Sequence, residues 1–286
     1  MSIKIKRLTK QTIEARIPYT QTNDFEKWFL LCSDVHFDNP KCQRKLFFDH
    51  LKQAKERDAK VLINGDFFCL MNGKYDPRRS LTNIRPEHKH DNYLDLVIND
   101  AADQLRPYAK NLLIFGHGNH EQTVSQNCNT AVLDRLVERI NLFEGTKLQV
   151  APYQGLCRFK FHDNNQAIRK INLFFHHGKW GGVVTKGVLG AMRYSTIYPD
   201  ADIVVTGHTH DQWIVKQPQF KVKANGEWIV KNQYHIKTGT YKEEFIEGDT
   251  WANKNIVMPK SLGGYWLRFY YSRKVHNICF DIIETS

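Results

Sequence analysis

The chain has 286 residues, of which 41% are apolar and 25% charged, and its formal net charge is +11. This composition supports a sizeable core and excludes general disorder. No apolar run reaches ~18 residues, which argues against a membrane span. Residues 1–10 lack the apolar core of an export signal, so we expect a cytoplasmic protein. The six cysteines are scattered without a Cys-x-x-Cys pair, which indicates reduced thiols.

The first half of the chain alternates predicted strands and helices. Residues 1–20 predict one or two edge strands. Short apolar runs predict three buried strands, at residues 28–32, 61–64 and 112–115. Helical spacing of apolar residues predicts three helices, at residues 43–58, 92–109 and 129–140. A strand-helix-strand unit is right-handed and makes its two strands parallel.

Strands dominate the second half of the chain. Residues 147–176 predict short strands separated by turns, the last of them at 171–175, and a short helix is predicted near 188–194. Further strands are predicted at residues 203–206, 212–216, 219–223, 227–237, 264–271 and 276–283. No linker or internal repeat interrupts the pattern, so we expect one domain, residues 1–286, with a mixed layered α/β fold.

Five predicted strands end in residues that carry a carboxylate, an amide or an imidazole. These residues are Asp34, His36, Asp66, Asn119, His120, His176, His177, His208 and His210. Ligand sites in α/β sheets collect at the carboxyl ends of strands, so we expect these side chains to meet. Each motif alone is compatible with an ordinary turn or a core histidine. The repetition at five strand ends is what argues for a site.

The composition of this set indicates metal binding. Two carboxylates, one amide and at least four imidazoles would be costly to bury together without a cation. One metal needs about four to six donors, whereas a larger set around a central carboxylate suits two metals ~3.5–4 Å apart. Mixed oxygen and imidazole ligation favours transition metals over Ca or Mg. The sequence therefore predicts two divalent transition-metal ions, with Mn the first choice and Fe, Zn, Co or Ni as alternatives.

The motifs Asp-x-His, Gly-Asp, Gly-Asn-His-Glu, His-Gly and Gly-His-Thr-His follow one another over residues 34–210. In this order they resemble the calcineurin-like metallophosphoesterase family. The resemblance implies a four-layer α-β-β-α sandwich of two mixed sheets flanked by helices, with a dinuclear metal site at one sheet end.

The resemblance also implies a role for each motif residue. It implies that one metal is held by Asp34, His36 and His210, that the other is held by Asn119, His177 and His208, and that Asp66 bridges both. His120 would lie beside the scissile phosphate as the catalytic residue. His177 is preferred over His176 because Gly178 follows it, and adjacent strand residues face opposite ways.

The expected reaction is hydrolysis of a phosphoester by a metal-bridging hydroxide, because two cations lower the pKa of a shared water. His120 would protonate the leaving oxygen or stabilise its charge. The metal ligands do not distinguish a diester from a monoester.

The substrate is indicated only by basic residues. A polar insertion at 71–91 carries the candidate substrate-binding residues Arg78, Arg79, Arg85 and His88. Basic residues among aromatic ones suit DNA or RNA, although a solvated loop has the same composition. We expect a phosphodiesterase or nuclease acting on nucleic acid or nucleotides. The alternatives are a phosphomonoesterase acting on protein or small molecules, and a non-catalytic metal-bound scaffold. Nothing in the sequence indicates the oligomeric state.

Overall fold

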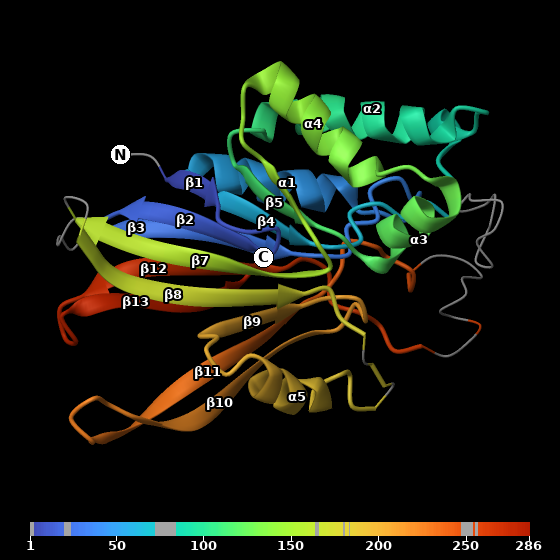
Figure 1. The fold of residues 1–286 in the computed structure, drawn as a ribbon. Coiled ribbons are helices and arrows are strands. Elements are labelled where there is room, and N and C mark those ends of the chain that lie inside the picture. The colour runs from blue at the N-terminus through green and yellow to red at the C-terminus, as the bar shows by residue number, and fades with distance from the viewer. Residues whose placement is uncertain are drawn as a thin grey trace.

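Two β-sheets pack face to face in the computed structural model, which describes residues 3–19, 24–71, 84–163, 166–179, 181–182, 184–246, 254 and 257–286 (Figure 1). The seven-stranded sheet has the order β1 (Lys4–Arg7), β2 (Thr12–Pro18), β7 (Gln154–Asp163), β8 (Gln166–His176), β9 (Ile203–Thr206), β11 (Trp228–Thr238) and β10 (Gln212–Val222). The six-stranded sheet has the order β13 (Asn277–Glu284), β12 (Tyr265–Ser272), β3 (Glu26–Cys32), β4 (Lys60–Asn64), β5 (Leu112–Gly116) and β6 (Gln149–Ala151).

Helices cover the outer faces of both sheets (Figure 1). The six-stranded sheet is covered by α1 (Arg44–Glu56), α2 (Tyr93–Leu105) and α4 (Val132–Glu144), with short 3-10 turns η2 (Pro86–His88) and η3 (Arg106–Tyr108) between them. The outer face of the seven-stranded sheet carries α5 (Leu189–Ile197). The expected four-layer sandwich of two mixed sheets is therefore confirmed. Among the described helices, none has the length and apolar character needed to cross a membrane.

Both sheets contain neighbouring parallel strands. In one sheet β3, β4, β5 and β6 are parallel neighbours, and in the other β9 runs parallel to both β8 and β11. Antiparallel strands β12 and β13 complete the six-stranded sheet. Because parallel strands share a direction, their carboxyl ends lie along one edge of the sheet, which is where the predicted site residues follow them.

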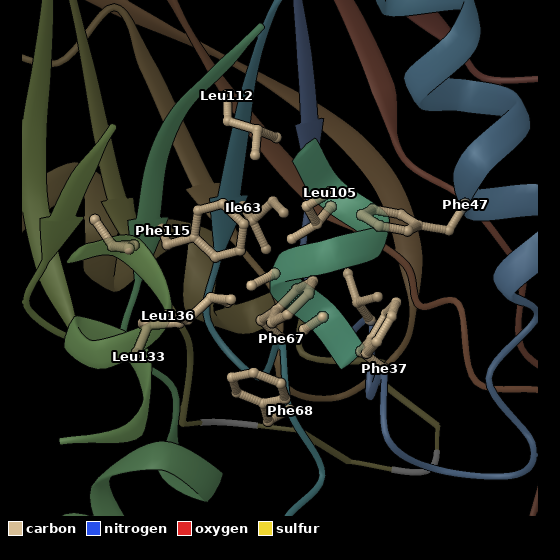
Figure 2. Packing of buried hydrophobic residues seen from close by; sticks show 14 of the residues in the cluster. Phe37, Phe47, Ile63, Phe67, Phe68, Leu105, Leu112, Phe115, Leu133 and Leu136 are labelled. Carbon is tan, nitrogen blue, oxygen red and sulfur yellow. The ribbon is translucent and has the colours of Figure 1, made fainter. Parts of the chain in front are cut away.

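Two apolar cores hold these layers in place. Between the sheets, the ring of Phe29 lies 4.6 Å from that of Phe159 and 5.7 Å from that of Phe269. Between the six-stranded sheet and its helices, Phe67 packs 4.9 Å from Phe115 in the cluster of Figure 2. Each aromatic side chain removes ~150–250 Å² from water. Since Phe67 directly follows Asp66, burial of its ring anchors the turn that carries this site residue.

Two details of the predicted strands are wrong. The strands predicted at 212–216 and 219–223 are one strand, β10, which continues through Pro218. Proline has no backbone N–H, but β10 is the edge strand of its sheet, where a missing donor is tolerated. The short strands predicted within 147–176 are mostly two long antiparallel strands, β7 and β8. Their polar and apolar residues alternate because only one face is buried against the other sheet.

Candidate metal centre

The predicted ligands lie in turns at the carboxyl ends of parallel strands from both sheets. On the six-stranded sheet, Asp34 and His36 follow β3, Asp66 follows β4 and Asn119 follows β5. On the seven-stranded sheet, His177 follows β8, and His208 and His210 follow β9. The structure brings all seven residues together from five separate parts of the chain.

Asp34, His36 and His210 form the first group of donors. The Nε2 atoms of His36 and His210 lie 3.1 Å apart, and Nε2 of His210 lies 3.4 Å from Oδ1 of Asp34. One ligand atom from each residue lies within 4.8 Å of the other two. Three donor atoms thus point at one small space.

Asp66, His177 and His208 form the second group, again within 4.8 Å of one another. Nε2 of His177 lies 3.0 Å from Oδ2 of Asp66, and Nδ1 of His208 lies 2.8 Å from Oδ1 of Asn119. Nε2 of His177 is also 4.0 Å from Oδ1 of Asp34, which connects this group to the first. The two groups are therefore adjacent, with the Asp66 carboxylate inside the cluster.

The donor set fits divalent metal ions. Among the described residues, Oδ1 of Asp34 and Nε2 of His177 are buried atoms without a hydrogen-bond partner. Nε2 of His177 and Oδ2 of Asp66 approach to 3.0 Å close to this Asp34 oxygen. Buried polar atoms that lack a partner are costly. A cation between them would satisfy both atoms, and their mixture of oxygen and nitrogen suits a transition metal.

The surrounding charges prepare the imidazoles as ligands. Burial, together with the nearby His120 ring, lowers the pKa of His36 well below its ordinary value. Burial and His177 likewise lower the pKa of His208. Burial also acts to lower the pKa of His177, but Asp66 and Asp34 outweigh it and raise this pKa to about 10. His36 and His208 are therefore neutral and ready to bind a metal, whereas His177 holds a proton where a cation would sit.

Five of the candidate ligands have a left-handed backbone. Their φ angles are 51° for Asp34, 51° for His36, 48° for Asp66, 72° for His208 and 59° for His210. They make up half of the ten non-glycine residues with positive φ in the described part of the chain. This conformation costs about 1–3 kcal/mol per residue and is concentrated at functional sites. The backbone at these five residues is therefore strained, and this conformation directs their side chains into the site.

Two glycines allow the turns to approach one another closely. A Cβ atom on Gly118 would lie 2.1 Å from Oδ1 of Asp66, and one on Gly65 would lie 2.3 Å from Nδ1 of His177. Nδ1 of His177 donates a hydrogen bond to the carbonyl oxygen of Asn64 at 2.8 Å. That bond fixes the ring so that Nε2 faces the carboxylates.

His120 lies beside the two groups, in the first turn of α3 (Asn119–Cys128). Nδ1 of His120 donates to the carbonyl oxygen of Cys69 at 2.5 Å, and Nε2 lies 3.8 Å from Oδ2 of Asp66. His120 also forms a close group with His36 and Cys69. Burial raises the pKa of the Cys69 thiol to about 12, so the thiol stays protonated and is a poor metal ligand.

Glu121 is an important residue whose role the sequence did not reveal. Its fully buried carboxylate accepts backbone N–H groups from Gly118 at 2.9 Å, Asp66 at 3.2 Å and Phe68 at 2.9 Å. Burial and the charge of Asp66 raise the pKa of Glu121 to about 7. The spacing of Gly118 and Glu121 matches that of a capping box, but glycine has no side chain to complete it, so the sequence did not mark this contact.

Asp38 is a second buried carboxylate that the sequence did not single out. It accepts the backbone N–H of Cys69 at 2.5 Å and of Leu70 at 2.9 Å, and the hydroxyl of Tyr93 at 2.6 Å. These bonds hold the segment that contains the Cys69 carbonyl, the partner of His120. No pattern of spacing in the sequence marks Asp38 for this role.

The predicted substrate-binding residues are only partly described. Arg78 and Arg79 lie outside the described residues. Arg85 donates to the carbonyl oxygen of Cys42 at 3.3 Å. His88 is 1% exposed, and its Nε2 lies 2.9 Å from a carboxylate oxygen of Asp100. The prediction that His88 contacts substrate is corrected here, because a buried side chain in an ion pair is not available to a ligand.

The layered fold and the cluster at the shared edge of its sheets are those of a metal-dependent phosphoester hydrolase. A family model described as calcineurin-like phosphoesterase matches residues 27–212, a span that contains every candidate ligand. The chain belongs to this family.

Several solved structures resemble the fold at low identity. Vps29 from Cryptosporidium parvum is 14% identical, with 92% of this chain and 100% of that chain covered and a TM-score of 0.39. A metallophosphoesterase from Sphaerobacter thermophilus is 13% identical, with 92% and 89% covered and a TM-score of 0.38. GAP50 of Plasmodium is 12% identical, with 91% and 84% covered and a TM-score of 0.40. Scores this low support no argument about function. No curated protein matches the chain.

Proposed function

We propose that this protein hydrolyses phosphodiester bonds in nucleic acid or nucleotides at a centre for two divalent transition-metal ions. The observation that carries the proposal is the pair of adjacent three-residue donor groups, each within 4.8 Å. Asp34, His36 and His210 would hold one ion, Asn119, His177 and His208 would hold the other, and Asp66 would bridge them. Manganese is the first candidate, and Fe, Zn, Co or Ni would suit the same donors.

The bound ions would supply a Lewis acid for the phosphate oxygens and would lower the pKa of the attacking water. The chain supplies the negative charge that retains them. Burial acts to raise the pKa of Asp34 and of Asp66, but the charge of His177 outweighs it and keeps both pKa values below their ordinary range. Both carboxylates are therefore ionised near neutral pH. Glu121 and Asp38 fix the backbone around them through the hydrogen bonds described above.

His120 would act on the leaving group. Its Nδ1–H bond to the Cys69 carbonyl sets the tautomer and the orientation of the ring, so that Nε2 is the atom turned toward the Asp66 side of the centre. When doubly protonated, His120 can donate the Nε2 proton to the departing oxygen and return to the neutral form. Before transfer, the same N–H stabilises the charge that develops on that oxygen.

A diester in nucleic acid is favoured by charge. The net charge of +11 favours a polyanion over a small neutral or cationic substrate. The basic insertion that follows Asp66 in sequence, with Arg78, Arg79 and Arg85, supports the same class of substrate.

The test compares bis-p-nitrophenyl phosphate with p-nitrophenyl phosphate after loading with manganese, and then assays labelled single-stranded DNA and RNA. We expect faster turnover of the diester and cleavage of at least one polymer. Faster turnover of the monoester would replace this proposal with a phosphomonoesterase. An Asp34→Asn variant purified in parallel controls for contaminating phosphatases, because it should lose activity on every substrate.

A further inference from the structure

A cavity of about 480 Å³ lies at the turn that precedes α3, the helix that begins with the candidate ligand Asn119. Its polar lining is formed by Arg7, Lys10, His117, Gln122, Ser125 and Gln126, with Asp134 also at the wall. Residues 150–152, at the end of the edge strand β6, close its apolar side. The cavity thus lies between the turn after β1, the end of β5 and one face of α3.

Two segments that line the cavity continue into segments that contact the metal centre. His117 precedes the candidate ligand Asn119 by two residues, and Gln122 follows His120 by two residues in α3. Pro152 precedes Tyr153, whose ring lies 5.3 Å from that of His177.

Arg7 gives the cavity a fixed positive charge. Its Nε donates to Oε1 of Gln149 at 3.0 Å, its Nη1 to the carbonyl oxygen of Lys10 at 2.9 Å, and its Nη2 to the carbonyl oxygen of Val150. These bonds use three of the five N–H donors of the guanidinium and hold it in place. A cation that is already oriented loses little entropy when it binds an anion.

The other charges around the cavity leave a positive balance. Lys10 adds a second cation next to Arg7. The carboxylate of Asp134 lies 3.3 Å from Nε2 of His117, so its charge is directed at that ring. The amide groups of Gln122 and Gln126 and the hydroxyl of Ser125 are donors of the kind that contact phosphate and sugar without reading sequence.

We propose that this cavity binds a flanking backbone phosphate of the strand whose scissile phosphate lies at the metal centre. The inference rests on the proposed action on nucleic acid and assigns the site that holds the flanking strand. It implies that the protein prefers substrates long enough to reach Arg7 and Lys10. A mononucleotide or a small diester gains nothing from the cavity.

The test measures binding of a fluorescein-labelled 12-nucleotide single strand in EDTA, by anisotropy over a range of salt concentrations. The Arg7→Gln/Lys10→Gln double variant should bind about tenfold more weakly, and the slope of log affinity against log salt should fall by about 0.7, the value for loss of one phosphate contact on a single strand. Gln126→Glu, an exposed helical substitution that removes no contact of Arg7, should weaken binding in the same direction. The matched control is Lys52→Gln/Lys55→Gln, which removes two exposed charges near the end of α1.

Cleavage by the manganese-loaded protein gives a second readout. Wild-type protein should cleave the 12-nucleotide strand with a lower KM than a three-nucleotide strand, and the cavity variants should lose that difference. If both cavity variants bind and cleave as the Lys52/Lys55 control does, the cavity assignment is overturned while the proposed function stands. If the wild-type protein hydrolyses bis-p-nitrophenyl phosphate but binds no strand, both the cavity assignment and the nucleic-acid substrate fall, and only diesterase activity remains.

Discussion

The Nε2 atoms of His36 and His210 face each other at 3.1 Å, although His36 follows a strand of one sheet and His210 a strand of the other. Two neutral imidazoles can share only one proton across such a gap, and burial together with His120 disfavours a charged His36. A bound cation would be coordinated by both nitrogens and also by Oδ1 of Asp34, which has no hydrogen-bond partner.

Metal binding should therefore stabilise the folded protein. At a manganese concentration about 100 times Kd, the free energy of unfolding should rise by about 2.7 kcal/mol, because the unfolded chain offers no such cluster. For a chain of this size that corresponds to an increase in Tm of roughly 4–5 °C. Differential scanning fluorimetry of the EDTA-treated protein checks this value. A His36→Ala variant should show a much smaller increase, and an equal increase would place the ions elsewhere.

Removal of the His120 side chain should separate catalysis from metal binding. His120→Ala should retain both ions, because Nδ1 bonds to the Cys69 carbonyl and the residue lies beside the donor groups. Its turnover should fall by ~10²–10⁴-fold, the usual contribution of a general acid. Asp66→Asn is the contrasting variant and should lose metal and activity together. Metal analysis and initial rates decide the outcome. Metal loss in His120→Ala would make His120 a ligand.

A methyl group at Gly118 should disturb the centre and lower the stability of the protein. The backbone of Gly118 has φ −107°, which alanine can adopt, but the added Cβ would lie 2.1 Å from Oδ1 and 2.3 Å from the backbone nitrogen of Asp66. We expect Gly118→Ala to have a lower free energy of unfolding, to bind less metal and to lose most activity. Gly116→Ala is the matched control, since its Cβ would lie 3.4 Å from the nearest atom. Similar metal content in both variants would contradict the proposed position of Asp66.

Substitution of Glu121 should lower the free energy of unfolding. Glu121→Ala leaves three buried N–H groups without an acceptor, which should lower the free energy of unfolding by about 3 kcal/mol or more. Glu121→Gln retains one carbonyl acceptor and should cost less. Urea denaturation of both variants measures the difference. Equal stability of wild type and Glu121→Ala would show that these bonds do not hold the Asp66 turn.

Stability should fall in mild acid because of His235. This side chain is 2% exposed, and burial lowers its pKa from 6.5 to about 4. Between pH 6.5 and 4 the unfolded state therefore binds more protons than the folded state, so the free energy of unfolding falls as pH falls. The contribution of His235 should be about 2 kcal/mol between pH 7.5 and 5. His235→Gln should make the fall in stability smaller by about this amount in urea titrations, and an unchanged profile would contradict a buried neutral His235.

The sequence predicted the layers of the fold and the strands that position the site, because short apolar runs ended in a residue with a carboxylate, an amide or an imidazole at five places. It could not predict α3, since residues 119–128 have weak apolar periodicity and a glycine in place of the usual N-cap side chain. It also divided β10 at Pro218, because a pattern along one strand does not reveal that the strand lies at a sheet edge.

The residues that fix the site were harder to predict than the ligands themselves. Ser33, for example, bonds to the carboxylate of Asp34 and lies 2.6 Å from the hydroxyl of Thr238, which is 205 residues away. His88 appeared to be part of a basic binding loop, but its partner Asp100 belongs to the next helix. Such contacts depend on the packing of distant segments, for which local spacing carries no information.

Each donor group draws on both sheets: His210 joins Asp34 and His36 across the gap, and Asn119 meets His208. The ions would therefore link the two sheets at the end of the sandwich where the donor groups lie. Farther from the site, packing of Phe29, Phe159 and Phe269 holds the sheets together without metal. Metal binding would then make the end that carries the donor groups more rigid and would leave the rigidity of the aromatic core unchanged. Without metal, the aromatic core between the sheets would stay packed, and only the end of the sandwich that carries the donor groups would become more mobile.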